Sequence, residues 1–209
     1  MNEPVPTVHI VDDDPAVREA LSSLLRSVGM NVRTFESARE FLSGERSAEP
    51  SCLVLDVNMP GASGLDLQQE LRRAGEMIPI VFITGYGDIP TTVRAMKAGA
   101  TEFLPKPFSE ENLLQAIRSA LEHAAVLRED RAELAAFRGR MARLTPRERE
   151  VLGCLLSGRL HKQVAAELGI SETTVKVHRH RIMEKMAANS LVHLARMTEK
   201  LRGASLSDV

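Results

Sequence analysis

Residues 7–29, TVHIVDDDPAVREALSSLLRSVG, contain the pattern that decides the fold. They begin with an apolar run, Thr7–Val11, which has the length and the β-branched residues of a buried strand. Three aspartates follow, and Asp14 precedes Pro15 as an N-cap residue precedes a proline in the first position of a helix. Apolar residues then recur at helical spacing until Gly29, which is a helix stop signal. The segment therefore predicts a strand joined to a helix by a short acidic turn.

Four more strand-like apolar runs follow in the first half of the chain. They are Asn31–Phe35, Cys52–Asp56, Ile78–Thr84 and Thr101–Leu104. The segments between them carry apolar residues at helical spacing and helix start signals, such as the capping box of Ser37 and Glu40. Strands that alternate with helices form right-handed crossovers, and helices then cover both faces of a parallel sheet. We therefore expect a doubly wound α/β domain with a five-stranded parallel sheet.

A long segment without glycine or proline follows Pro107 and ends only at Gly139. Its apolar residues, from Leu113 to Leu134, recur near a 3.5-residue spacing, so we expect one long helix that leaves the α/β domain and becomes a linker. Two interpretations of this apolar stripe remain open. It is either a dimer seam or a face that packs on the sheet up to about Leu121 and then frays.

The C-terminal part of the chain contains four helical patterns. The first begins at Thr145, where a capping threonine, a proline at N1 and Glu148 at N3 form a capping box. The others are expected over Lys162–Leu168, from the Ser171 cap to about Met186, and over Leu191–Met197. Two short helices joined by a glycine-containing turn, the second rich in Lys, Arg and Thr, are typical of a helix-turn-helix. The predicted fold is α/β plus all-α, with domains over residues 1–122 and 140–209 and a helical linker over 123–139.

The charge of the chain is divided between its two ends. In total, 27 basic and 28 acidic residues give a net charge of −1. Residues 1–122 carry 11 basic and 18 acidic residues, whereas residues 139–209 carry 13 and 7. A compact basic domain makes nucleic acid the first candidate partner. No apolar stretch is long enough to span a membrane and no signal peptide is evident, so we expect a cytoplasmic protein without membrane contact.

Unusual polar residues stand at the predicted carboxyl ends of the strands. Asp12 and Asp13 follow the first strand, Asp56 ends the third, Thr84 ends the fourth, and Lys106 follows the fifth. Ligands bind at this edge of an open parallel sheet, and clustered carboxylates favour a hard cation such as Mg²⁺, or Mn²⁺ in its place. With a metal bound, Asp56 would be competent as a nucleophile toward phosphorus, with Thr84 and Lys106 as partners of the phosphoryl oxygens. The alternative is an ordinary solvated turn, a loop and a surface lysine.

Four motifs then carry a resemblance to a known family. They are Val11–Pro15, Leu55–Gly61, Phe82–Gly85 and Phe103–Phe108. In order and spacing these motifs resemble the receiver domain of two-component response regulators over about residues 6–122. Over its whole length the chain is similar to the FixJ-like subfamily, which joins a receiver to a four-helix LuxR-type DNA-binding domain.

The resemblance implies a role for each acidic residue. Asp56 would be the phosphoacceptor. Asp13 and the backbone carbonyl of Asn58 would hold Mg²⁺ together with Asp56, and Asp12 would act mainly through coordinated water. Lys106 would pair with the phosphoryl group, and the peptide bond after it would be cis, as X-Pro bonds sometimes are.

A phosphorylation switch needs an element with two states. The resemblance implies that Thr84 moves toward the phosphoryl group and that Phe103 enters the space it leaves. The alternative for Phe103 is a static core residue. Tyr86 flanks the same site, and we expect it to obstruct an attacking water and slow the loss of phosphate.

The third helix of the basic domain is the predicted recognition helix. Its buried face would hold Val175, Ile182 and Met186. Lys176, Val177 and His180 match the base-reading positions of the subfamily, and each has chemistry suited to a major groove. Contacts with DNA phosphates or packing roles are expected for Thr173, Thr174, Arg179 and Arg181.

These features predict a transcriptional regulator that a sensor histidine kinase phosphorylates on Asp56. We expect it to form a homodimer on promoter DNA when phosphorylated and to contact RNA polymerase, with no turnover of a separate substrate. An aspartate-nucleophile phosphatase is a competing interpretation, although Asn58 occupies the position where such enzymes need a general acid. Constitutive DNA binding with a structural receiver is another.

Overall fold

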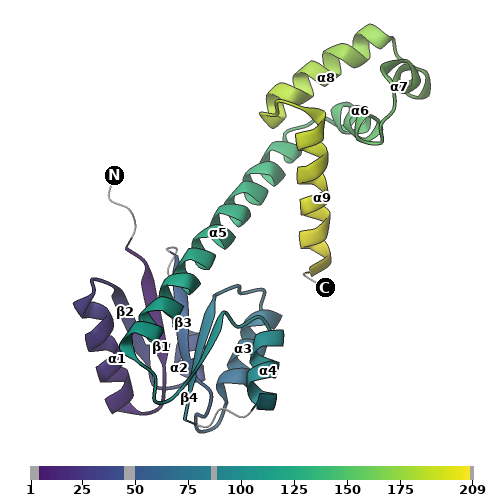
Figure 1. The fold of residues 1–209 in the computed structure, drawn as a ribbon. Coiled ribbons are helices and arrows are strands. Elements are labelled where there is room, and N and C mark those ends of the chain that lie inside the picture. The colour runs from purple at the N-terminus through teal and green to yellow at the C-terminus, as the bar shows by residue number, and fades with distance from the viewer. Residues whose placement is uncertain (1–4, 45–49, 86–88, 208–209) are drawn as a thin grey trace. The chain divides into compact units, whose positions relative to one another are not determined.

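The computed structural model describes residues 5–44, 50–85 and 89–207, and Figure 1 shows its fold. The chain separates into two compact units, Met1–Arg128 and Glu129–Val209. Tyr86, which we expected to flank the phosphoryl site, lies outside the described residues.

A parallel five-stranded sheet forms the centre of the first unit. Its strands are β1 (Thr7–Val11), β2 (Asn31–Phe35), β3 (Ser51–Asp56), β4 (Ile80–Thr84) and β5 (Glu102–Pro105). They lie in the order β2-β1-β3-β4-β5, and every neighbouring pair is parallel. The predicted sheet is therefore confirmed, and all strands but β4 lie within one residue of their predicted bounds. β4 begins at Ile80 rather than Ile78 because Pro79 has no amide proton to donate to the ladder.

Four helices connect these strands. They are α1 (Pro15–Ser27), α2 (Ala38–Ser43), α3 (Gly64–Arg73) and α4 (Ile89–Lys97). Asp14 is the N-cap of α1, as predicted, and its side chain accepts a hydrogen bond from the Ala16 amide at 2.8 Å. The acidic turn between β1 and α1 is therefore short and tightly defined.

Apolar side chains cover both faces of the sheet. One core cluster joins Ile10 of β1 to Leu25 of α1 and Ile117 of the helix that follows β5. The other cluster joins Phe82 of β4 to side chains from α2, α3 and α4, among them Leu67. The two clusters show the doubly wound arrangement. Strand order reverses between β1 and β3, so the carboxyl ends of these strands flank the usual ligand position.

The helix that follows β5 is a single element of 33 residues, α5 (Glu110–Ala142). Its first turns bury Leu113 and Ile117 in the core of the first unit. Its last turns contribute Phe137, which is 3% exposed, to the core of the second unit. The expectation of one long helix is confirmed. Of the two open interpretations of its apolar stripe, the one in which the helix frays after about Leu121 is wrong, because α5 stays helical to Ala142 and buries Phe137 near its end.

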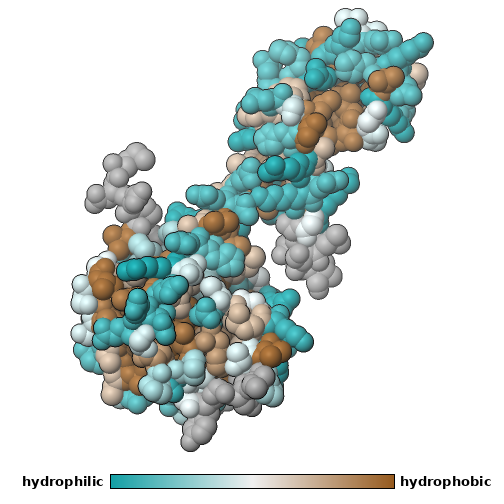
Figure 2. All heavy atoms as spheres, in the orientation of Figure 1, coloured by the Kyte–Doolittle hydropathy of each residue, from teal (hydrophilic) through white to brown (hydrophobic). Residues whose placement is uncertain are grey.

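Four further helices complete the second unit. They are α6 (Pro146–Leu156), α7 (His161–Leu168), α8 (Glu172–Met186) and α9 (Leu191–Ser207). The capping box of Thr145 and Glu148 is formed as predicted. α9 continues ten residues past the predicted end at Met197, because Leu201 packs against the same core and extends the buried face. In the view of Figure 2, hydrophilic residues dominate the exterior of each unit, with apolar residues between them.

None of the helices in the described ranges is both long enough and apolar enough to cross a membrane.

Candidate functional site

Three charged side chains from three strand ends meet at the carboxyl edge of the sheet. Asp12 follows β1, Asp56 is the last residue of β3, and Lys106 follows β5. The Nζ atom of Lys106 lies 3.0 Å from Oδ2 of Asp12 and 2.9 Å from Oδ1 of Asp56. Lys106 is 94 positions from Asp12 and 50 positions from Asp56 in the chain, and the sheet order brings these residues together.

Asp12 is held on both oxygens of its carboxylate. It is 1% exposed, and Oδ1 accepts a hydrogen bond from the Asp14 amide at 2.9 Å while Oδ2 contacts Lys106. The Asp12 amide donates to the Phe35 carbonyl at the end of β2. Its carboxylate therefore has a fixed direction toward the centre of the site.

Asp56 is also held on both oxygens. Oδ2 accepts a hydrogen bond from the Asn58 amide at 2.6 Å, and Oδ1 accepts one from Lys106. Burial raises the pKa of Asp56 above its ordinary value, although the hydrogen bond and the charge of Lys106 act to lower it. Burial acts to lower the pKa of Lys106, but its hydrogen bonds to Asp56 and Asp12 outweigh burial and leave that pKa raised. The lysine is therefore an ammonium at neutral pH and binds both carboxylates.

Thr84 and Asn58 complete the edge of the site. Thr84 ends β4 and is fully buried, and its Oγ1 accepts a hydrogen bond from Nδ2 of Asn58 at 3.4 Å. The hydroxyl of Thr84 is thus connected through Asn58 to the loop that follows Asp56. The Lys106-Pro107 bond is cis, as the resemblance implied.

The described residues do not place Asp13 beside the other two carboxylates. Within residues 5–44, 50–85 and 89–207, no three His, Cys, Asp or Glu side chains are grouped closely enough to hold one metal ion. Asp13 is exposed, whereas Asp12 and Asp56 share the ammonium of Lys106. Carboxylate and carbonyl oxygens are still the ligand type that Mg²⁺ prefers, and two buried carboxylates facing one ammonium leave negative charge at this edge. The donor set therefore fits a divalent cation chemically.

Two residues that support this site were not predicted. Arg18, on α1, donates from Nη1 to the carbonyls of Asp12 and Asp13, and Gly64 opens α3 directly against Asp56. A Cβ atom on Gly64 would lie 2.3 Å from the carbonyl oxygen of Asp56, so only glycine fits there without movement of the backbone. Neither contact has a local sequence signal, because each depends on how a helix packs against a strand end.

Phe103, the predicted switch residue, lies on β5 and is half-buried. Its ring packs against the core cluster that contains Phe82, with the two ring centroids 6.2 Å apart. The side chain is therefore in contact with the core without being enclosed by it.

The second unit presents the predicted recognition face on α8. Val175, Ile182 and Met186 are buried, as predicted from their spacing. The exposed residues of the helix include all of the predicted DNA contacts except Thr174: Thr173, Lys176, Val177, Arg179, His180 and Arg181. Thr174 is half-buried and its hydroxyl lies 2.8 Å from that of Ser171, so it belongs to the N-terminal cap of α8.

An ion pair beneath α8 was also missed. Nζ of Lys185, near the end of α8, lies 2.9 and 2.7 Å from the two carboxylate oxygens of Glu148 at the start of α6. Glu148 is 3% exposed, and its hydrogen bonds with Lys185 and with the Thr145 amide lower its pKa from 4.5 to about 2. The sequence predicted Glu148 only as a capping residue, whereas it also holds the end of α8 through Lys185.

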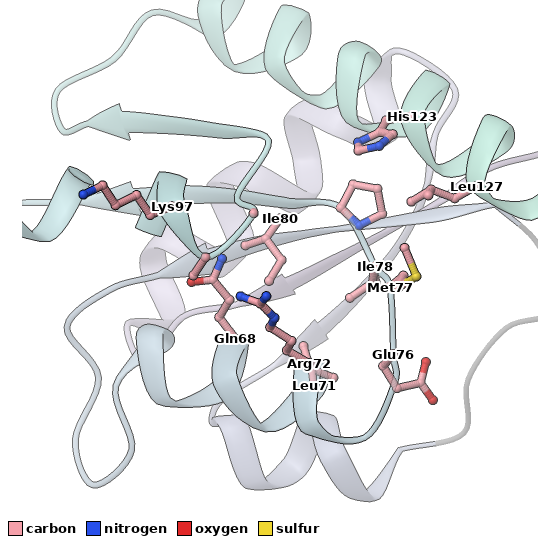
Figure 3. Close-up of a pocket in the computed structure, with 13 residues that line it drawn as sticks. Gln68, Leu71, Arg72, Glu76, Met77, Ile78, Ile80, Lys97, His123 and Leu127 are labelled. Atoms are coloured by element: carbon pink, nitrogen blue, oxygen red, sulfur yellow. The ribbon is translucent and has the colours of Figure 1, made fainter. Parts of the chain in front are cut away.

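A cavity of about 350 Å³ lies elsewhere in the first unit, near the amino end of β4 (Figure 3). It is lined by side chains from α3, α4 and α5 that include Gln68, Leu71, Lys97, His123 and Leu127. Gln68 donates a hydrogen bond to the Ala95 carbonyl at 3.2 Å and so joins α3 to α4. None of the predicted site residues lines this cavity, which is separate from the carboxyl edge of the sheet.

Comparison with known proteins matches two separate parts of the chain to two families. Residues 8–118 match the family described as "Response regulator receiver domain", and residues 142–198 match "Bacterial regulatory proteins, luxR family". The chain is 51% identical to the response regulator protein TmoT of Ectopseudomonas mendocina, over 97% of this chain and 92% of TmoT. It is 44% identical to the transcriptional regulatory protein FixJ of Azorhizobium caulinodans, over 94% and 93%. Among solved structures, the response regulator StyR has a TM-score of 0.80 and 52% identity, over 94% of this chain and all of StyR.

Proposed function

The chain belongs to the response regulators of two-component systems that join a receiver domain to a LuxR-type DNA-binding domain, and we propose that Asp56 is its phosphoacceptor. Proteins of this kind are transcriptional regulators, and the receiver implies a histidine kinase as partner. The observation that carries the proposal is the Lys106 ammonium between the carboxylates of Asp12 and Asp56 at the strand ends. Residues 1–122 would be the phosphoacceptor domain, 123–139 the helical connection and 140–209 the DNA-binding domain.

The proposed reaction is a phosphoryl transfer onto a carboxylate. An oxygen of Asp56 attacks phosphorus, the bond from phosphorus to the histidine nitrogen of the kinase breaks, and its electron pair stays on that nitrogen. An acyl phosphate on Asp56 results. Lys106, whose Nζ lies 2.9 Å from Asp56, would pair with the phosphoryl oxygens, and the Thr84 hydroxyl would donate to one of them.

Mg²⁺, or Mn²⁺ in its place, is the metal that the oxygen donors of this site fit. When bound, it screens the negative charge of the carboxylates and of the phosphoryl group. Asp13, Asp56 and the backbone carbonyl of Asn58 would hold the ion, and Asp12 would orient water on it. Rotation of the exposed Asp13 side chain is then required, because the carboxylate lies outside the group formed by Asp12 and Asp56.

The phosphoryl group would act on DNA binding through a change in the receiver. Thr84 would turn toward the new phosphoryl oxygens, and Phe103, half-buried beside Phe82, would fill the space behind it. The surface of the receiver that changes with Thr84 and Phe103 would form a homodimer. The homodimer would place two copies of α8 on two half-sites of a promoter. Lys176, Val177 and His180 would read base edges.

Further partners follow from this role. Thr173, Arg179 and Arg181 would contact DNA phosphates, because all three are exposed on α8. Regulation of a promoter implies contact with RNA polymerase and a place in the cytoplasm, where bacterial DNA lies. Asn58 stands where an aspartate-nucleophile phosphatase needs a general acid, which favours a lasting acyl phosphate over turnover.

Footprinting across genomic DNA tests this proposal. The full-length protein is incubated with Mg²⁺, with and without a small acyl phosphate donor. We expect footprints that appear or strengthen when the donor is present. Footprints that ignore the donor would contradict the switch, and the absence of footprints in both samples would contradict the DNA-binding assignment.

A further inference from the structure

The side chain of Arg18 reaches back from α1 to the acidic turn that precedes this helix. Its Nη1 atom donates to two successive backbone carbonyls, that of Asp12 at 2.7 Å and that of Asp13 at 3.0 Å. A guanidinium nitrogen carries two hydrogens in a fixed plane, so one nitrogen is able to serve both carbonyls. Arg18 is half-buried, and its contact therefore fixes the path of the turn from the side of α1.

The two aspartates depend on this contact to different degrees. Asp12 has three other restraints, because its carboxylate binds the Asp14 amide and Lys106 and its amide binds the Phe35 carbonyl. The carboxylate of Asp13 accepts no hydrogen bond from the part of the chain that the structure describes. The link from the Asp13 carbonyl to Arg18 is therefore the side-chain contact that restrains this residue.

We propose that Arg18 is a positioning residue for the divalent cation, acting through the backbone of Asp13. This inference rests on the proposed function, in which Asp13 is a metal ligand. By holding the peptide of Asp13 still, Arg18 leaves only the rotation of the Asp13 side chain to be fixed when the ion binds. Residues that orient metal ligands without touching the ion typically change metal affinity by about 10–100-fold when they are replaced.

The charge of Arg18 predicts the opposite effect, and this makes the idea testable. A guanidinium beside the site repels a divalent cation, so its removal would tighten metal binding if charge alone mattered. Loss of positioning would instead weaken binding. The direction of the change therefore distinguishes the two roles.

The experiment is a Mg²⁺ titration of the full-length protein by isothermal calorimetry, without any phosphodonor. We compare wild type, Arg18→Met, Arg18→Lys and the matched control Arg26→Met. Arg26 is exposed in the last turn of the same helix, more than two turns from the acidic turn. We expect both Arg18 variants to bind Mg²⁺ about 10-fold or more weakly than wild type. Lysine keeps the charge but lacks the planar fork, so it should not restore the affinity, whereas Arg26→Met should bind as wild type does.

Hydrogen exchange on the same samples provides a second readout without metal. The amides of Asp13 and Asp14 should exchange faster in Arg18→Met, while those of β1 and β3 stay as slow as in wild type. Mg²⁺ affinity that is unchanged or tighter in Arg18→Met would overturn the inference, as would unchanged exchange in the turn. Wild type that binds no Mg²⁺ would instead contradict the proposed function itself, and Asp13→Asn, which should lose binding, checks that the measured site is this one.

Discussion

Replacing Lys185 with methionine removes the partner of a buried carboxylate while keeping most of the aliphatic side chain. The hydrogen bonds of Glu148 lower its pKa from 4.5 to about 2, which corresponds to roughly 3 kcal/mol of stabilisation. Lys185 is the larger cause, but the Thr145 amide shares the effect and a third of the lysine side chain is exposed to screening solvent. We therefore expect Lys185→Met to destabilise the second unit by about 1–2 kcal/mol.

Amide hydrogen exchange on the full-length protein measures this loss locally. Peptides from α6 and α8 should exchange faster in Lys185→Met, by a factor that corresponds to the lost free energy. Peptides from β1 and β3 in the first unit serve as an internal reference and should not change. Lys176→Met is the matched control, because Lys176 is an exposed lysine on the same helix. Equal exchange in both variants would refute the idea that the ion pair of Glu148 and Lys185 holds α8.

The same pair predicts a pH dependence with a definite sign. Because the pKa of Glu148 is lower in the folded protein than in the unfolded chain, its contribution is complete above pH 4.5 and is lost as the pH falls toward about 2. Unfolding of the second unit by denaturant, followed from neutral to acid pH, should show this loss in wild type. In Lys185→Met the loss should be smaller, and an identical pH profile would contradict the assignment.

Three further substitutions follow from particular contacts. Gly64→Ala should slow phosphoryl transfer and destabilise the first unit by about 1–3 kcal/mol, because the Cβ atom of the alanine would collide with the Asp56 carbonyl. A rate of phosphorylation equal to that of wild type would contradict this. Ala187→Gly should stabilise the second unit by about 0.5–1 kcal/mol in denaturant unfolding. Ala187 ends α8 with a φ of 48°, which glycine adopts without strain. A loss of stability in this variant would contradict the prediction. Lys176→Ala should weaken binding to a specific DNA site more than binding to random DNA if Lys176 reads bases. An equal loss of affinity for both DNAs, with the slope of log affinity against log salt concentration smaller by about 1, would instead identify a phosphate contact.

Much of the fold follows from local signals along the chain. Asp14 before Pro15 and glycine after an apolar periodic run define α1 without reference to the rest of the molecule. Alternating strands and helices then leave few topologies, and the carboxyl ends of parallel strands meet at one edge. For that reason Asp56 and Lys106, 50 residues apart, could be placed together from sequence.

Contacts that depend on helix packing were not accessible in the same way. Lys185 and Glu148 are 37 residues apart on two helices whose crossing no local pattern specifies. Arg18 binds backbone carbonyls, which carry no residue-type signal. The motif predicts Asp13 as a metal ligand, yet its carboxylate is exposed, and only Asp12 and Asp56 pair with the ammonium of Lys106.

The most direct test of the central claim is the affinity of the full-length protein for a promoter fragment, measured by fluorescence anisotropy with and without an acyl phosphate donor and Mg²⁺. Wild type and Asp56→Asn are compared, and mass spectrometry of the Asp56 peptide verifies the modification. Couplings between distant sites typically change affinity by about 5–150-fold. We predict that the donor raises the DNA affinity of wild type by a factor within this range and does not raise the DNA affinity of Asp56→Asn. An equal gain in both proteins, or no gain in phosphorylated wild type, would contradict the account.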